Sequence, residues 1–180
     1  ESTGLKGSKI APDLLMNLAI GQYDTYTPVS LLQYANTIAN DGVRLKLSLM
    51  HSIKESDVIL LENEATVLNK ISLEEKYLKR IQAGFRDVIK HGTGYYYVKS
   101  GLDAAGKTGT SESYIDANYD GVLDSYVVSN TFLMYAPFDN PKYSMVVISP
   151  NTSNLNGKSE YRSGVNRLIA RNISDFLFSS

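Results

Sequence analysis

The sequence predicts one α+β domain in which helices flank an antiparallel sheet. Apolar residues recur at helical spacing through much of the first hundred residues, and three alternating or continuously apolar segments follow between residues 104 and 149. Short turn-rich connections join these segments, which favours antiparallel neighbours. An amphipathic segment closes the chain. At 180 residues the chain is long enough to bury a sizeable core as a single domain.

Composition excludes several function classes. The chain is 43% hydrophobic and 21% charged, as is usual for a globular domain, and its net charge of -1 provides no field that would attract nucleic acid. Cysteine is absent, which excludes disulfides, thiolate metal sites and cysteine nucleophiles. No apolar run approaches the roughly 18 residues that a membrane-spanning helix needs.

Two helices are expected near the start of the chain. Ala11–Ile20 is apolar and predicts a short helix with Pro12 in its first turn. Thr27 followed by Pro28 is typical of a helix start, because the hydroxyl can cap the first turn and proline suits the first helical position. That helix should end at 40–42, which read Asn-Asp-Gly.

Strand and turn are expected over Val43–Leu61, where apolar residues alternate. Ser72 and Glu75 have the spacing of a capping box and predict a helix over Leu73–Lys90. Tyr95–Val98 is aromatic and β-branched, which indicates a strand or an ordered loop.

The second half of the chain supplies the sheet. Strands are expected over Ala104–Tyr114, Ser125–Tyr135 and Lys142–Ser149. Residues 136–141, which read Ala-Pro-Phe-Asp-Asn-Pro, form a tight connection between the last two. The final helix covers about 165–177.

Two motifs with different chemistry overlap at the start of the first of these strands. Gly101–Thr108 fits G-x-x-x-x-G-K-[ST], the phosphate-binding loop in which backbone amides cradle phosphates. Such a loop must lead into a helix whose N-terminus faces the phosphates. The next residues, 109–114, include a glycine and several weak helix formers. The phosphate-binding interpretation is therefore disfavoured.

The second interpretation is a K-T-G-T strand, made of Lys107, Thr108, Gly109 and Thr110. K-T-G is the third motif of acyl-serine enzymes, after S-x-x-K and S-x-N. The ammonium and the two hydroxyls can bind a substrate carboxylate, and the ammonium can help proton transfer. Glycine keeps the strand surface clear. The amide of Thr110 can donate to an oxyanion, an interaction that contributes several kcal/mol in typical enzymes.

With these motifs in place, the chain resembles the C-terminal portion of the transpeptidase domain of penicillin-binding proteins, and the class B enzymes most of all. The resemblance covers nearly the whole chain. Its blocks are Leu18–Gln22 with Thr27-Pro28, Thr37–Gly42, Gly84–Ile89 with Gly92-Thr93, Ala105–Glu112, and Tyr135–Tyr143. It implies part of the β-lactamase/transpeptidase-like fold, with 1–100 as a mainly helical part and 101–180 as three sheet strands and a C-terminal helix.

The resemblance also implies a function. The protein would be a serine D,D-transpeptidase that cross-links peptidoglycan stem peptides through an acyl-enzyme and is inhibited by β-lactams. Lys107, Thr108 and Thr110 would bind the carboxylate of the substrate or drug, and Gln22 would lie near the cleft. No cofactor is required. The protein would act on the outer face of the bacterial cytoplasmic membrane, through an anchor that these residues do not include.

The chain departs from the family in its first two motifs. No serine has a lysine three residues later, and S-x-N is expected to be absent as well. Tyr34–Asn36 matches a Tyr-x-Asn variant, but it lies inside an expected helix. The simplest explanation is that the chain begins after both motifs, so alone it should neither react with a β-lactam nor cross-link peptides. Without the N-terminal half of the domain, an uncovered sheet edge would invite self-association.

An acidic stretch between the first two sheet strands resembles the start of an EF-hand calcium loop. The ligand positions would be filled by Asp116, Asn118, Asp120, the carbonyl of Val122, and Asp124. Gly121 stands at the sharp turn, but Val127 replaces the bidentate glutamate at position twelve. Two alternatives stay open: a weak Ca²⁺ site, or a plain acidic turn whose residues tolerate turn conformations.

Two other functions also stay open. A serine β-lactamase or a β-lactam sensor shares the fold and the K-T-G motif, although the class B-like blocks disfavour it. A non-catalytic, calcium-binding extracellular module is the second alternative.

Overall fold

The computed structural model describes residues 15–21, 24–152 and 164–179, and it confirms an antiparallel sheet with helices packed against it. The sheet contains β5 (Ala105–Ile115), β6 (Ser125–Ala136) and β7 (Tyr143–Thr152), in that order. Both pairings are antiparallel, and the register sets Thr108 opposite Phe132 and Phe132 opposite Val147. All three predicted strands are therefore confirmed, each within a few residues of its expected ends.

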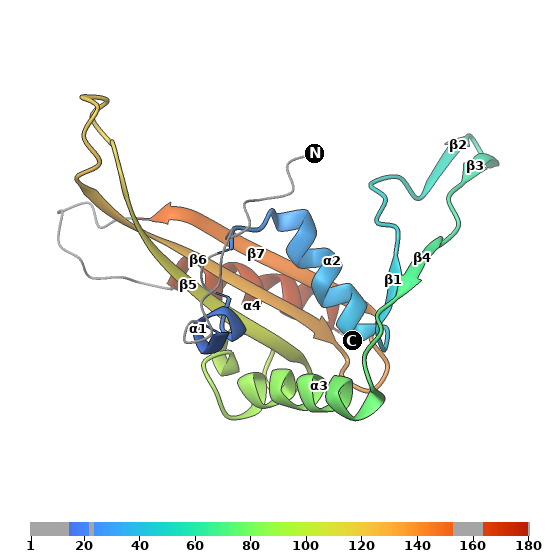
Figure 1. Cartoon of the computed structure of the whole chain (residues 1–180). Helices are drawn as coiled ribbons and strands as arrows, with labels where there is room; N and C mark the ends of the chain where they lie inside the picture. Colours follow the sequence, from blue (N-terminus) through green and yellow to red (C-terminus); the bar gives the residue numbers. More distant parts are fainter. Residues whose placement is uncertain (1–14, 22–23, 153–163, 180) are drawn as a thin grey trace.

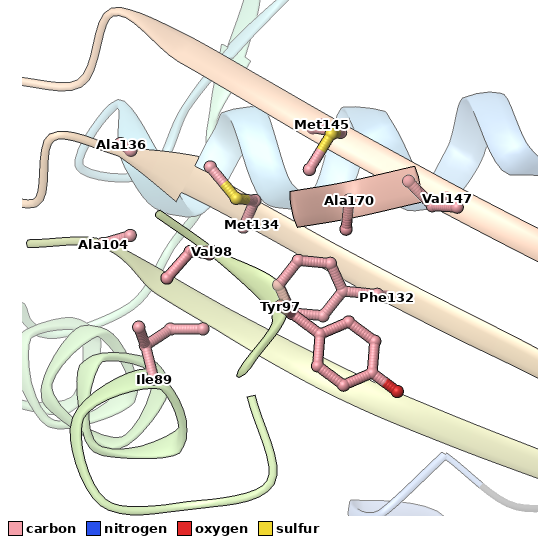
Figure 2. Close-up of a cluster of buried hydrophobic side chains, with 10 residues drawn as sticks. All are labelled: Ile89, Tyr97, Val98, Ala104, Phe132, Met134, Ala136, Met145, Val147 and Ala170. Carbon is pink, nitrogen blue, oxygen red and sulfur yellow. The ribbon is translucent and has the colours of Figure 1, made fainter. Parts of the chain in front are cut away.

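Helix α4 (Gly164–Leu177) covers one face of the sheet, and helix α2 (Pro28–Ala39) covers the other (Figure 1). Side chains alternate between the two faces along each strand. On the α4 face, Phe132, Met134, Met145 and Val147 pack with Ala170, and Tyr97 lies against Phe132 (Figure 2). Burying these side chains supplies the apolar core that holds α4 to the sheet.

On the α2 face the core is formed by Ile38, Leu78, Ala105 and Tyr135. Helix α2 begins where the sequence predicts, because the Thr27 hydroxyl accepts a hydrogen bond from the Ser30 amide at 3.2 Å. The short helix α1 (Leu15–Ala19) falls within the predicted segment, whereas Pro12 lies outside the described residues.

Helix α3 (Glu75–Lys90) runs beside β5. Its Gln82 side chain is buried and donates to the Ile38 carbonyl at 2.8 Å, which ties α3 to the end of α2. The predicted capping box is wrong: Glu74 is the residue before the helix, and no side chain caps it. The Glu74 carbonyl accepts the first hydrogen bonds of the helix. Ser72 therefore lies too far upstream to cap the N-terminus of α3.

Two small sheets are formed by the part of the chain that follows α2 and precedes α3. Strand β1 (Val43–Leu45) pairs with β4 (Val67–Lys70), and β2 (Ser52–Glu55) pairs with β3 (Val58–Glu62). Together they form an arm that projects from the domain (Figure 1). The predicted strand and turn over Val43–Leu61 is confirmed. Strand β4 was not predicted, so the first hundred residues contain more strand than expected.

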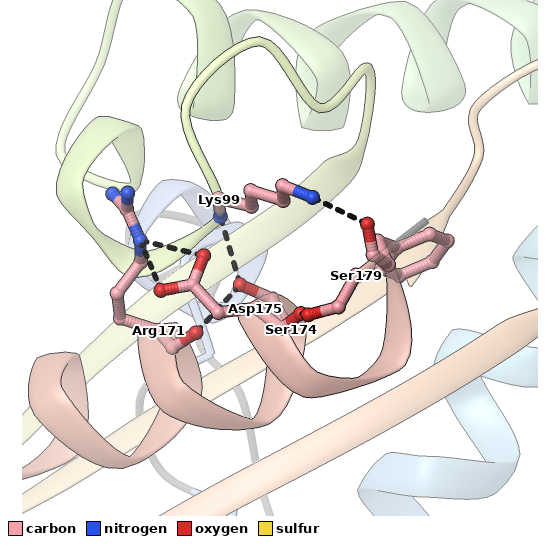
Figure 3. A network of polar contacts seen from close by, with 6 residues as sticks. Lys99, Arg171, Ser174, Asp175 and Ser179 are labelled. Carbon is pink, nitrogen blue, oxygen red and sulfur yellow. Dashed lines mark hydrogen bonds and ion pairs between the residues drawn. The ribbon is translucent and has the colours of Figure 1, made fainter.

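The aromatic segment after α3 forms a short 3-10 helix, η2 (Tyr95–Tyr97), in place of the expected strand or loop. The next residues are anchored to α4 (Figure 3). The Lys99 amide donates to the fully buried Ser174 hydroxyl at 2.8 Å, and the Lys99 ammonium donates to the Phe178 carbonyl. These two bonds hold the segment at Lys99 against α4.

An ion cluster fixes the start of β5. The Arg86 guanidinium binds both oxygens of Asp103, with Nε at 2.9 Å from Oδ1, and the Lys90 ammonium lies 3.6 Å from Oδ1. Arg86 also stacks over the Phe138 ring at 4.3 Å, and the Phe138 amide donates to the Asp103 carbonyl at 2.9 Å. The cluster thus joins α3, β5 and the β6–β7 connection.

This cluster predicts how stability depends on pH. The hydrogen bonds from Arg86, and then the charges of Arg86 and Lys90, hold the pKa of Asp103 below its usual value. A carboxylate whose pKa is lowered on folding stabilises the protein above the pKa of the unfolded state, about 3.9. That contribution disappears as the pH falls through the folded-state pKa. Thermal unfolding from pH 7 to pH 2 should show Asp103→Asn less stable than wild type at neutral pH, with the difference vanishing in acid.

Glu74→Gln is the matched control, because Glu74 pairs with Lys76 in a salt bridge whose side chains are about two-thirds exposed. It should change the unfolding temperature little at any pH. A constant difference between Asp103→Asn and wild type across the pH range would contradict the account.

Candidate active site

The K-T-G-T residues lie on β5 at the point where the strand leaves the core. Ala105 and Gly106 are buried, whereas Lys107 and all residues from Gly109 to Tyr114 are exposed. The chain continues as a strand to Ile115, so no helix follows the Gly-Lys-Thr letters and the phosphate-binding interpretation is excluded. In the described part of the chain, β5 pairs only with β6, which leaves its other edge accessible beyond the end of α3.

The register sets the four residues on two faces. Thr108 and Thr110 lie opposite Phe132 and Asn130 on the α4 face, and Lys107 lies on the α2 face. The lysine side chain nevertheless stays close to the strand backbone, because its ammonium donates to the carbonyl of the next residue, Thr108. The ammonium and the Thr108 hydroxyl therefore belong to one short stretch of the strand edge.

A residue from outside the motif contacts this stretch. The Thr93 hydroxyl, in the loop between α3 and η2, lies 2.7 Å from the Thr108 hydroxyl. Thr93 belongs to one of the blocks of family resemblance, but no sequence pattern predicts its contact with Thr108. The one sequence feature that could have indicated this contact is the position of Thr93 between two glycines just after a helix end, because glycines let a loop approach other backbone closely.

The two glycines of the strand differ in their surroundings. A Cβ on Gly106 would lie 2.6 Å from the Leu133 carbonyl oxygen and 3.2 Å from the Ile89 side chain. A Cβ on Gly109 would meet nothing closer than the Thr131 Cβ, at 3.6 Å. Gly106 is thus required by packing, whereas at Gly109 the strand surface is clear, as the motif predicts.

Of the two remaining candidates, the structure describes only Tyr34–Asn36. Gln22 lies outside the described residues. The Tyr34 ring of the Tyr-x-Asn segment packs edge-on against Phe85 of α3, 6.1 Å between centroids, which indicates a packing role.

The expected absence of S-x-N is wrong by its letters, which occur once in the chain, after the K-T-G strand, at Ser149-Pro150-Asn151. These residues lie on β7, which β6 separates from β5. The Ser149 hydroxyl donates to the buried Asn166 side chain, which itself donates to the Asn130 and Val147 carbonyls at 2.8 and 3.2 Å. This match therefore helps attach α4 to the sheet, and it is not the second catalytic motif.

The acidic loop follows β5 as the sequence predicts. The side chains of the loop bind its own backbone amides. Asp116 accepts hydrogen bonds from the amides of Asp120 and Gly121 at 3.1 and 2.8 Å, and Asp120 accepts one from the amide of Val122 at 2.8 Å. Asn118 also donates to Asp120 at 2.8 Å. Within the described residues, no three acidic or histidine side chains gather as a metal site would require. Asp124, near the end of the loop, is exposed. Calcium binding by this loop stays a prediction.

Comparison with known proteins identifies the family. A family model described as the penicillin binding protein transpeptidase domain matches residues 1–175. The chain belongs to the penicillin-binding protein transpeptidase family. Penicillin-binding protein 2A of Bacillus subtilis is 37% identical over 84% of this chain, and penicillin-binding protein 2B of Streptococcus pneumoniae is 33% identical over 96%. The chain spans 22% and 25% of the length of these two relatives.

Solved structures confirm the fold. Penicillin-binding protein 2B of Streptococcus pneumoniae superposes with a TM-score of 0.75 at 29% identity, over 99% of this chain and 29% of that one. Penicillin-binding protein 3 of Mycobacterium tuberculosis superposes with a TM-score of 0.71 at 24% identity, over 99% of this chain and 41% of that one. The chain thus has the β-lactamase/transpeptidase-like fold. Among its described helices, none has the length and apolar character needed to cross a bilayer.

The contrast between the two glycines of β5 can be tested. Gly106→Ala must displace backbone or the Ile89 side chain, and such overpacking should cost about 1–3 kcal/mol of unfolding free energy. Gly109→Ala has room for its methyl group and should change stability by less than about 0.5 kcal/mol. Chemical denaturation of both variants checks this. Equal destabilisation by the two substitutions would show that β5 is packed differently.

Proposed function

We propose that this chain forms the carboxylate-binding wall of a serine D,D-transpeptidase active site. The observation that carries the proposal is the Lys107–Thr110 motif on the exposed part of β5, in a chain of the penicillin-binding protein transpeptidase family. An exposed strand with a cation and two hydroxyls suits an extended substrate that ends in a carboxylate.

Each residue has a distinct part in binding. The Lys107 ammonium, held beside the Thr108 carbonyl, attracts the carboxylate electrostatically. The hydroxyls of Thr108 and Thr110 lie on the same face of the strand, about 7 Å apart along it, and donate hydrogen bonds to the substrate. Gly109 between them leaves the strand clear for the substrate backbone.

The chemistry needs a nucleophile that the motifs of this chain do not supply. We propose that a Ser-x-x-Lys segment of the same domain lies outside these residues, consistent with relatives that are several times longer. The serine oxygen attacks the substrate carbonyl, the C–N bond breaks, and a proton passes to the leaving nitrogen. The Thr110 amide and the serine amide stabilise the oxyanion, and a second stem peptide then accepts the acyl group.

The substrates follow from this assignment. They are peptidoglycan stem peptides, with β-lactams as inhibitors that acylate the same serine, at the outer face of the bacterial cytoplasmic membrane. In the complete domain, the remaining residues would supply strands beside β7, the last strand of this sheet, and would leave the free edge of β5 to the substrate. The 180 residues alone are expected to be inactive.

A fluorescent penicillin tests the proposal on the intact protein. Wild type should become covalently labelled, and Lys107→Ala should label about ten- to a hundredfold more slowly, because a charge-assisted hydrogen bond contributes about 1.5–3 kcal/mol. Lys54→Ala, on the exposed strand β2 of the arm, should label at the wild-type rate.

Two results would contradict the proposal. Absence of labelling would exclude an acyl-serine enzyme. Rapid loss of the label by hydrolysis would indicate a β-lactamase, because a transpeptidase releases the penicilloyl group slowly.

A further inference from the structure

We propose that Thr93 is a positioning residue that aims the Thr108 hydroxyl at the substrate carboxylate, an inference that rests on the proposed function. Thr93 lies fifteen residues before Thr108 in the sequence, outside the K-T-G-T motif. Its hydroxyl oxygen lies 2.7 Å from that of Thr108, a normal distance for a hydrogen bond between two hydroxyls.

The loop that carries Thr93 is held in place by packing. The Gly94 amide donates to the Val88 carbonyl at 2.9 Å, which folds the loop back on the end of α3. A Cβ on Gly94 would lie 2.7 Å from the Ile89 side chain, so the loop sits as close to the helix as a glycine allows. Thr93 therefore approaches Thr108 from a fixed backbone.

The same isoleucine also fixes the strand. The Ile89 side chain is buried, and it lies 3.2 Å from the position that a Cβ would take on Gly106, two residues before Thr108. One side chain thus sets the distance of both the loop and β5 from α3. The contact between the two hydroxyls is a consequence of this shared packing.

The direction of the hydrogen bond follows from the chemistry of the site. A threonine hydroxyl has one proton to donate and lone pairs to accept with, whereas a carboxylate only accepts. If Thr93 donates to Thr108, the Thr108 proton is left to point at the carboxylate, and the first bond polarises the second. The opposite direction would use the Thr108 proton within the protein. Substrate binding therefore selects Thr93 as the donor.

If Thr93 positions Thr108, its loss should change the reaction with β-lactams and leave the stability of the fold unchanged. Thr93 is exposed, and the packing that holds its loop involves glycine and backbone atoms. Thr93→Val keeps the shape of the side chain and removes only the hydroxyl. We therefore expect the variant to fold with an unchanged unfolding temperature while its reaction with carboxylate-bearing β-lactams slows.

The experiment is a double-mutant cycle on the intact protein, read as the second-order rate of acylation by benzylpenicillin. Thr93→Val should react about fivefold more slowly than wild type, as the loss of a hydrogen bond worth about 1 kcal/mol implies. Adding Thr93→Val to Thr108→Val should have no further effect, because the partner is already gone. Thr93→Ser should restore the rate, and the control Thr66→Val, on the exposed arm, should match wild type.

The methyl ester of benzylpenicillin supplies a readout that a structural role would not move. Because the ester has no carboxylate, Thr93→Val should slow its reaction no more than Thr66→Val does. An equal slowing of acid and ester, an additive double mutant, a wild-type rate for Thr93→Val, or a lowered unfolding temperature would each overturn the inference while leaving the proposed function intact. A wild-type protein that benzylpenicillin does not acylate would overturn both.

Discussion

The close approach between the end of α3 and the start of β5 determines how the candidate site is built. Ile89 is buried between the loop at Gly94 and the strand at Gly106, and both glycines leave room for it that any side chain would fill. Arg86, one turn earlier on α3, binds the Asp103 carboxylate just before the strand begins. Helix, loop and strand are therefore fixed relative to one another without any contribution from the exposed residues that would bind substrate.

This arrangement divides β5 into two parts with different tasks. Its first residues are buried between two cores and make the strand rigid, whereas Lys107 and the residues from Gly109 to Tyr114 are exposed. The motif lies where the two parts meet. Binding groups placed there keep the rigid support of the core while they remain accessible, which lowers the entropic cost of orienting them for a ligand.

Local sequence signals predicted the features that depend on local chemistry. The Thr27-Pro28 helix start and the three sheet strands, including the strand that carries K-T-G-T, are confirmed because each is encoded within a few neighbouring residues. The contact of Thr93 with Thr108 was missed, since it depends on how α3 packs on β5. Strand β4 was missed because all of its residues are exposed, so it has no alternation of buried and polar positions. The false capping box at Ser72 had the right spacing but lay upstream of the helix start.

The role that we propose for β5 is to bind the substrate carboxylate through Thr108, with Lys107 beside it. A crystal structure of the intact protein acylated by benzylpenicillin tests this most directly. We expect the drug carboxylate within hydrogen-bonding distance of the Thr108 hydroxyl and near the Lys107 ammonium, with the contact between the hydroxyls of Thr93 and Thr108 retained. A bound drug whose carboxylate lies away from β5, or turned toward another element, would contradict it.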